Sequence, residues 1–205
     1  MEVSLSGAGH EAHASSHEDH IDHDAKTRLG MFFYVLCDVM FALFMVSAYI
    51  FLRATNVNNQ WALPAGTKSV DAPTASLMLA ILVASALFFV LAHVSIRNDN
   101  RALANLGIVL ASLLWIAALV ANIWYMGHLP FTQREGGFAE MYLLFLGYHI
   151  YHLIFGIFFV IGIAVRTLQG RYSAARHLGY TTIGYYWYWT LIFAAVAFVL
   201  PMLLP

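Results

Sequence analysis

The chain has 205 residues, of which 61% are hydrophobic and only 10% are charged, and its mean hydropathy is +0.71. A soluble domain is roughly half apolar and about a quarter charged, so this composition indicates a membrane protein. The formal net charge of -1 leaves no excess of basic residues to neutralise phosphates, which argues against a nucleic-acid partner. A single cysteine, Cys37, excludes an internal disulfide.

Residues 1–27 are predicted to form a disordered, cytoplasmic tail rich in His and acidic residues. Five of the ten His and six of the eleven acids lie within the first 24 residues. Imidazoles at such short intervals can gather a metal ion, but no Cys or aromatic anchor closes the cluster into a defined site. A solvated low-complexity tail is therefore the favoured interpretation. The histidines are His10, His13, His17, His20 and His23.

Residues 28–205 are predicted to form an all-α, polytopic membrane domain with five transmembrane helices. A bilayer core of about 30 Å needs roughly 20 apolar residues in a helix, and five stretches of the chain meet this requirement. Polar, turn-forming segments such as Asn56–Gln60 and Gly170–Ser173 separate them. The predicted helices cover about residues 29–52, 72–95, 103–126, 138–165 and 178–204.

The distribution of Lys and Arg predicts the orientation of these helices. Seven of the ten basic residues fall on the side of the N-terminus and three fall on the other side. Basic residues are enriched in cytoplasmic loops, so we expect a cytoplasmic N-terminus and a C-terminus outside. The seven are Lys26, Arg28, Arg97, Arg101, Arg166, Arg171 and Arg176, and the three are Arg53, Lys68 and Arg134.

Three ionisable side chains lie deep within the predicted spans: Asp38, His149 and His152. A carboxylate in lipid is costly, so Asp38 is expected to face protein and to be protonated or paired. At 1.5 Å per residue, Asp38 lies about 14 Å from the inner edge and His149 about 16 Å from the outer edge of the membrane. These depths nearly coincide, which allows a contact between the two. In the alternative, each bonds a backbone carbonyl or a hydroxyl such as that of Ser47 or Tyr148.

His149 and His152 are three residues apart and therefore share a helix face, on which Gly156 permits close approach of a neighbouring helix. Two imidazoles could bind haem or a metal ion, but Asp38 is the only deep carboxylate available to complete such a site. Hydrogen-bonded packing is favoured over metal binding. Hydrolase, phosphate-loop and zinc-protease signatures are missing, so no catalytic residue is predicted.

The segment Gly147–Gly156, GYHIYHLIFG, resembles the G-x-H-x-x-H-V/L-x-x-G signature of haem-copper oxidase subunit III. The first helix is similar to that family's S-E/D-x-x-F helix, with Cys37 in the Ser position and Asp38 as the acid, which in the family reacts with carbodiimides. The resemblance extends from about residue 28 to the end. It includes the five-helix layout of the shorter bacterial forms, which implies a bacterial inner (plasma) membrane.

The chain departs from the family's pattern in two helices. The family usually carries a Glu near the outer end of the third helix, where Asn122 stands, and a W-H-F-V-D run in the last helix, where Trp187–Leu191 stands. These departures suggest a divergent branch, such as the subunit III-like protein of nitric oxide reductases. Gly156, Asn122 and Trp187 are candidates for contact with lipid or with another subunit.

The resemblance implies a noncatalytic subunit of a respiratory terminal oxidase. The chain would stabilise subunit I, hold phospholipid and support proton uptake while subunit I reduces oxygen to water and pumps protons. Haem and copper would lie in partners, namely subunit I, subunit II and further small subunits. Because the first and third helices contact subunit I in the family, small residues on both helices are expected to face it. They are Ala42, Ser47 and Ala48 on the first helix and Ala111, Ser112, Ala117, Ala118 and Ala121 on the third.

Two alternatives stay open. The first is the accessory protein of a nitric oxide reductase. The second is a small proton or metal transporter that relays through Asp38, His149 and His152, because intramembrane ionisable residues often do so. Transporters usually show a repeated half and helices broken by Gly or Pro, and this sequence shows neither.

Overall fold

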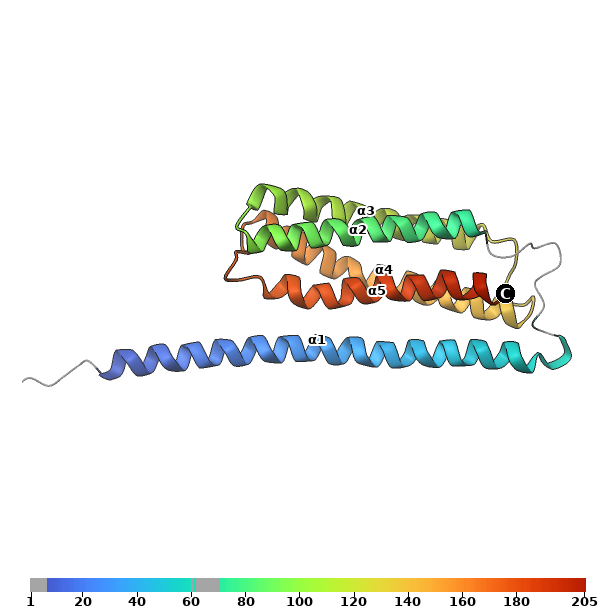
Figure 1. Cartoon of the computed structure of the whole chain (residues 1–205), viewed down its shortest axis with the longest axis horizontal. Coiled ribbons are helices and arrows are strands. Elements are labelled where there is room, and N and C mark those ends of the chain that lie inside the picture. The colour runs from blue at the N-terminus through green and yellow to red at the C-terminus, as the bar shows by residue number, and fades with distance from the viewer. Residues whose placement is uncertain (1–6, 60, 62–70) are drawn as a thin grey trace, which may run out of the picture.

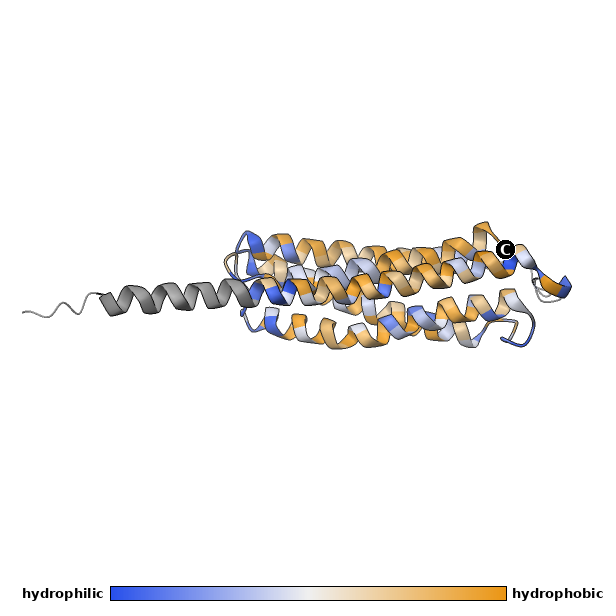
Figure 2. Cartoon of the chain, turned by 90° about the horizontal axis from the view of Figure 1, so that it is seen from below, coloured by the Kyte–Doolittle hydropathy of each residue, from blue (hydrophilic) through white to orange (hydrophobic). Residues whose placement is uncertain are grey.

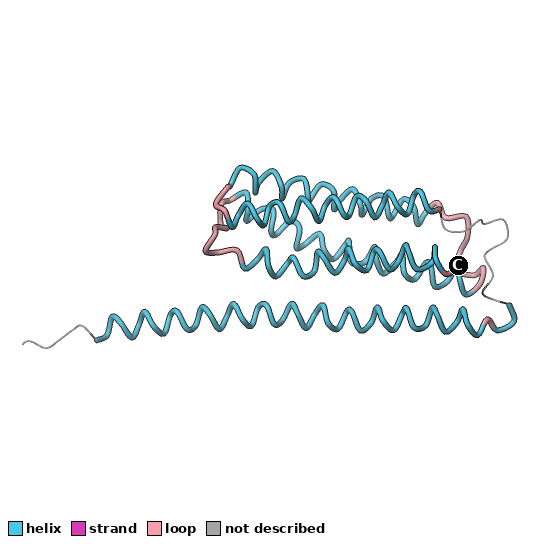
Figure 3. Tube along the Cα trace, in the orientation of Figure 1, coloured by secondary structure: helices cyan, strands magenta, loops and turns pink. Residues whose placement is uncertain are grey.

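The computed structural model describes residues 7–59, 61 and 71–205, with side chains from Asp24 onward. These residues form long helices, short loops and one short 3-10 helix, η1 (Val57–Asn59), without a strand (Figures 1 and 3). The prediction of an all-α protein is therefore confirmed for the described residues. The long helices are α1 (Gly7–Thr55), α2 (Ala72–Arg97), α3 (Arg101–Gly127), α4 (Gly137–Leu168) and α5 (Leu178–Leu203).

All five helices of the described chain are long and apolar enough to cross a membrane, which confirms the predicted spans. Figure 2 shows apolar residues along the helices and hydrophilic residues gathered at the two ends of the bundle. Helix α1 extends back to Gly7, into the segment for which the sequence predicts disorder. The histidines of that tail lie outside the described side chains, so their solvation and metal binding stay predictions.

Helices α2, α3, α4 and α5 form an antiparallel ring in which each helix packs against its two neighbours. Helix α1 lies outside this ring and packs along α5 and α4 (Figure 1). Consequently α1 buries only a small part of its surface, while α3 lies on the other side of the ring. Polar side chains of three helices converge where α1, α4 and α5 meet.

Local sequence explains where the helices end. Asn100 caps α3, because its side-chain oxygen accepts a hydrogen bond of 3.1 Å from the amide of Leu103. Gly170 follows the end of α4 with φ of 68°, a left-handed conformation that glycine adopts without steric cost. These short turns place α3 and α4 antiparallel to the helices that precede or follow them.

The structure corrects the expectation that small residues of α1 and α3 face another subunit for three of the eight residues named. Ala42, Ala111 and Ala118 are buried inside the chain itself, where they allow neighbouring helices to approach closely. The sequence could not reveal this, because the faces of a membrane helix toward lipid and toward protein are both apolar. The other five residues are exposed or partly exposed, so their contact with another subunit stays a prediction. They are Ser47, Ala48, Ser112, Ala117 and Ala121.

Candidate functional site

Asp38, in the middle part of α1, is the meeting point of three side chains from α4 and α5. Its Oδ1 accepts a hydrogen bond from the hydroxyl of Tyr148, and its Oδ2 accepts one from the indole N–H of Trp189. The same Oδ2 lies 2.5 Å from Nε2 of His152. The side chain of His152 is fully buried and that of Asp38 is 12% exposed. The deep carboxyl is thus surrounded by polar partners on its protein side.

The predicted contact between Asp38 and His149 is wrong, because the partner of Asp38 is His152. Neither ring nitrogen of His149 has a hydrogen-bond partner. Three helical positions correspond to a rotation of about 60° between the two side chains, so His149 faces the interior of the ring while His152 faces α1. The alternative expectation, a hydrogen bond from the Tyr148 hydroxyl to Asp38, is met.

The hydrogen bonds of His152 fix how many protons this site holds. Its Nδ1 lies 2.8 Å from the backbone carbonyl oxygen of Tyr148, which can only accept, so Nδ1 carries a hydrogen. The contact between Nε2 and the Asp38 carboxyl then contains one shared proton, on either the imidazole or the carboxyl. In both arrangements the pair has no net charge, which is suited to an apolar membrane interior.

Aromatic side chains hold this polar cluster in place. The ring centroid of Phe193 on α5 lies 5.5 Å from that of the His152 imidazole and 5.1 Å from that of the Tyr148 ring. The hydroxyl of Tyr186 donates a hydrogen bond of 2.7 Å to the backbone carbonyl of His152. Helix α5 therefore positions the part of α4 that carries the site.

Sequence reasoning missed Trp189 and named Tyr148 only as an alternative. The aromatic run Tyr185–Trp189 is typical of rings that pack in a buried helix. Within it, only Trp187 was named as a candidate, for contact with lipid or with another subunit, because it aligns with the family's pattern. The indole that reaches Asp38 belongs to Trp189, two residues further. The indication that could have identified it is chemical, because a tryptophan N–H in a membrane requires an acceptor and Asp38 is the strongest acceptor at that depth.

The chain matches the family model described as cytochrome c oxidase subunit III over residues 9–200. It belongs to the cytochrome c oxidase subunit III family. The resemblance found in the sequence is thereby confirmed, and it now covers nearly all of the chain.

Individual relatives share a modest identity with this member of the subunit III family. The cytochrome c oxidase subunit 3 of Petromyzon marinus is 26% identical over 165 residues, which cover 78% of this chain and 63% of the relative. That of Latimeria chalumnae is 27% identical, with coverage of 82% and 68%. That of Synechocystis sp. is 24% identical, with coverage of 90% and 78%. The chain thus spans 63% of the length of the Petromyzon protein.

The three residues predicted to touch lipid or another subunit all lie inside this subunit III chain, which corrects that prediction. Asn122 and Trp187 are buried, and Trp187 stacks on Phe89 with ring centroids 4.4 Å apart. A Cβ atom at Gly156 would collide with the ring of Trp115. The glycine at position 156 is thus explained by packing between helices of the same chain.

Metal-binding residues do not gather in the described part of the chain. Within residues 24–59, 61 and 71–205, no group of three or more His, Cys, Asp or Glu side chains is placed to hold a metal ion. His149 and His152 point in different directions, and His152 is engaged by Asp38 and by the Tyr148 carbonyl. The pair therefore does not form a joint ligand set.

Proposed function

We propose that the chain is a noncatalytic subunit III of a haem-copper terminal oxidase. The match to the subunit III family over residues 9–200 is the observation that carries this proposal. In the complex, subunit I contains the haem and copper centre that reduces oxygen to water, and the chain stabilises it together with subunit II and smaller subunits. The complex lies in a bacterial inner membrane with the N-terminus of this chain in the cytoplasm.

The Asp38–His152 pair is the part of the chain that supports proton uptake in this proposal. It holds one proton at the middle of α1, and the partial exposure of Asp38 leaves the carboxyl accessible from the surface of the helix bundle. Carbodiimides attack protonated carboxyls in apolar surroundings, and Asp38 is protonated when it carries the shared proton. The reactivity implied by the family therefore requires the arrangement in which the carboxyl carries the shared proton.

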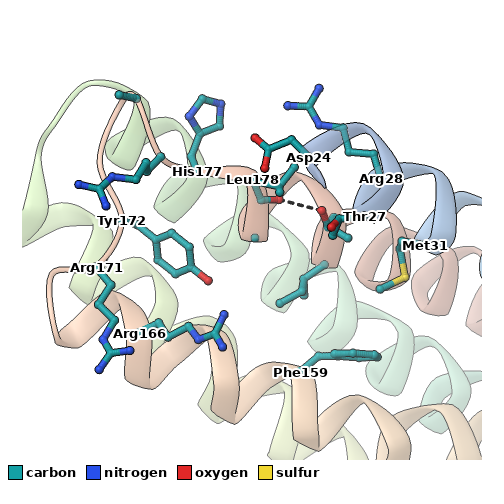
Figure 4. A pocket seen from close by; sticks show the side chains of 15 residues that line it. Asp24, Thr27, Arg28, Met31, Phe159, Arg166, Arg171, Tyr172, His177 and Leu178 are labelled. Carbon is teal, nitrogen blue, oxygen red and sulfur yellow. Dashed lines mark hydrogen bonds between the residues drawn. The ribbon is translucent and has the colours of Figure 1, made fainter. Parts of the chain in front are cut away.

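A basic cavity supports the binding of a phospholipid by this chain. It has a volume of about 600 Å³ and lies between α1, α4 and the start of α5, at the end of the bundle that holds most of the basic residues (Figure 4). Met31 and Phe159 contribute apolar walls. An anionic headgroup with its acyl chain matches this combination of charged and apolar lining. The basic lining residues are Arg28, Arg166, Arg171, Arg176 and His177.

Replacing Arg166 by Gln is expected to reduce the phospholipid retained by the purified complex. A hydrogen bond to a charged group contributes about 1.5–3 kcal/mol, so the affinity of the cavity should fall roughly tenfold or more. Lipid extracted from detergent-washed complex and quantified by mass spectrometry measures the effect. Arg134→Gln, in an exposed loop at the opposite end, is the matched control, and equal lipid loss in both variants would contradict a site at the cavity.

Mass spectrometry of the intact complex purified through this chain tests the proposed function. A haem-bearing subunit I that consumes oxygen is the expected partner. Copurification with a nitric oxide reductase would support the alternative favoured by the departures at Asn122, Tyr188 and Leu191. A chain that purifies alone and moves protons or metal ions across vesicles would instead support the transporter.

A further inference from the structure

His149 is fully buried inside the α2–α5 ring, yet neither of its ring nitrogens has a hydrogen-bond partner. On the side of α5 it faces the rings of Phe193 and Phe198, whose centroids lie 6.5 and 5.8 Å from that of the imidazole. A neutral imidazole has one N–H donor and one acceptor, and buried polar groups in native proteins are almost always satisfied. The site therefore requires a partner that the side chains do not supply.

Asn122 on α3 has a second unsatisfied polar atom inside the same ring. Its side chain is fully buried, and its amide nitrogen donates a hydrogen bond of 2.8 Å to the carbonyl of Ala118. This assignment leaves Oδ1 without a donor. An amide oxygen accepts hydrogen bonds only, so the missing partner of Asn122 must donate.

The register between α3 and α4 places these two groups at neighbouring levels of the ring. The hydroxyls of Tyr125 and Tyr142 lie 3.0 Å apart, and the indole N–H of Trp115 donates to the carbonyl of Leu153 over 3.0 Å. Because the helices are antiparallel, Asn122 lies between these two cross-links, level with residues 145–146. His149 is therefore about one helical turn, roughly 5 Å, further along the axis.

We infer that Asn122 and His149 bind a water molecule between them inside the ring. Lipid and other subunits cannot reach the two side chains, because both are fully buried within this chain. A water molecule can donate to Asn122 Oδ1 and bond a nitrogen of His149 at the same time. With hydrogen bonds of about 2.8 Å on each side, it spans atoms about 5 Å apart, and buried waters usually occupy such otherwise unsatisfied polar positions.

High-resolution electron cryo-microscopy of the complex purified through this chain tests the inference directly. Ordered density should appear about 2.7–3.2 Å from both Asn122 Oδ1 and a ring nitrogen of His149. A direct hydrogen bond between the two side chains, or closed apolar packing around them, would overturn it. The inference concerns only this chain's own ring and does not depend on the identity of the catalytic partner.

A double-mutant cycle provides an independent test in solution. Asn122→Leu and His149→Leu should each lower the melting temperature of the chain. Each removes one partner of the water and leaves the other polar side chain without its full set of hydrogen bonds. The double variant should melt no lower than the less stable single variant. Additive decreases would overturn the shared water. Thr190→Val is the matched control, because its buried hydroxyl bonds the Tyr186 carbonyl and its effect should add to that of Asn122→Leu.

Discussion

Asp38→Asn is expected to abolish carbodiimide labelling of the chain and to leave it folded and assembled. Carbodiimides attack protonated carboxyls in apolar surroundings, and Asp38 is the only acidic residue in the described part of the chain that lies in the middle of a span. Its partner His152 shares one proton with it, so a protonated carboxyl is available without net charge change. Labelling followed by peptide mass spectrometry measures the result.

The contacts of Asp38 explain why the variant should remain assembled. The new amide oxygen can accept from the hydroxyl of Tyr148, and the amide nitrogen can donate to Nε2 of a neutral His152. Only the indole N–H of Trp189 then loses its acceptor. One lost buried hydrogen bond costs about 1–3 kcal/mol, so the melting temperature should fall modestly while the helices stay together.

Under the proposed function, oxygen turnover by the Asp38→Asn complex should be largely kept, with faster inactivation during turnover. This is the behaviour of a residue that supports proton supply and does not touch the reacting atoms. Immediate and complete loss of turnover in an assembled complex would contradict the supporting role. Glu140→Gln, in the first turn of α4, is the matched control, and persistent labelling at Glu140 in the Asp38→Asn chain would remove Asp38 from the site.

The sequence correctly predicted that Asp38 is the acid of the site, but the predicted partner was His149 and the observed partner is His152. The reason is geometric. Depth along the membrane can be counted from residue numbers, and it places Asp38 close to both His149 and His152. The direction of each side chain around α4 depends on which helices are its neighbours. Helix α1 packs outside the ring against α5 and α4, and no pattern in the sequence indicates this arrangement.

Helix number and boundaries could be predicted because each span requires about 20 apolar residues and polar turns separate the spans. Packing faces could not, since lipid-facing and buried surfaces are equally apolar in a membrane. Ala118 and Leu113 illustrate this point: both are apolar residues of α3, yet the first is buried and the second is exposed. The fold class could therefore be predicted from the composition, whereas the face by which each helix packs on its neighbours could not.

Gly156→Ala is expected to destabilise the chain strongly, although alanine is the better helix former. The added Cβ would collide with the ring of Trp115 and would lie 3.0 Å from the ring of Tyr186. Neither ring can withdraw freely, because Trp115 donates to the carbonyl of Leu153 and Tyr186 donates to that of His152. Overpacking of this kind costs about 1–3 kcal/mol, measured as a lower melting temperature.

A second effect of Gly156→Ala should reach the Asp38 site. If the ring of Tyr186 moves to relieve the collision, its hydrogen bond to the carbonyl of His152 weakens, and carbodiimide labelling of Asp38 should change along with the stability. Gly147→Ala is the matched control on the same helix, because a Cβ atom at Gly147 would meet nothing within 4 Å. That variant should keep or raise the melting temperature, since alanine stabilises a helix by about 1 kcal/mol relative to glycine. Equal melting temperatures for the two variants would mean that the close approach of Trp115 and Tyr186 is not what requires glycine at position 156.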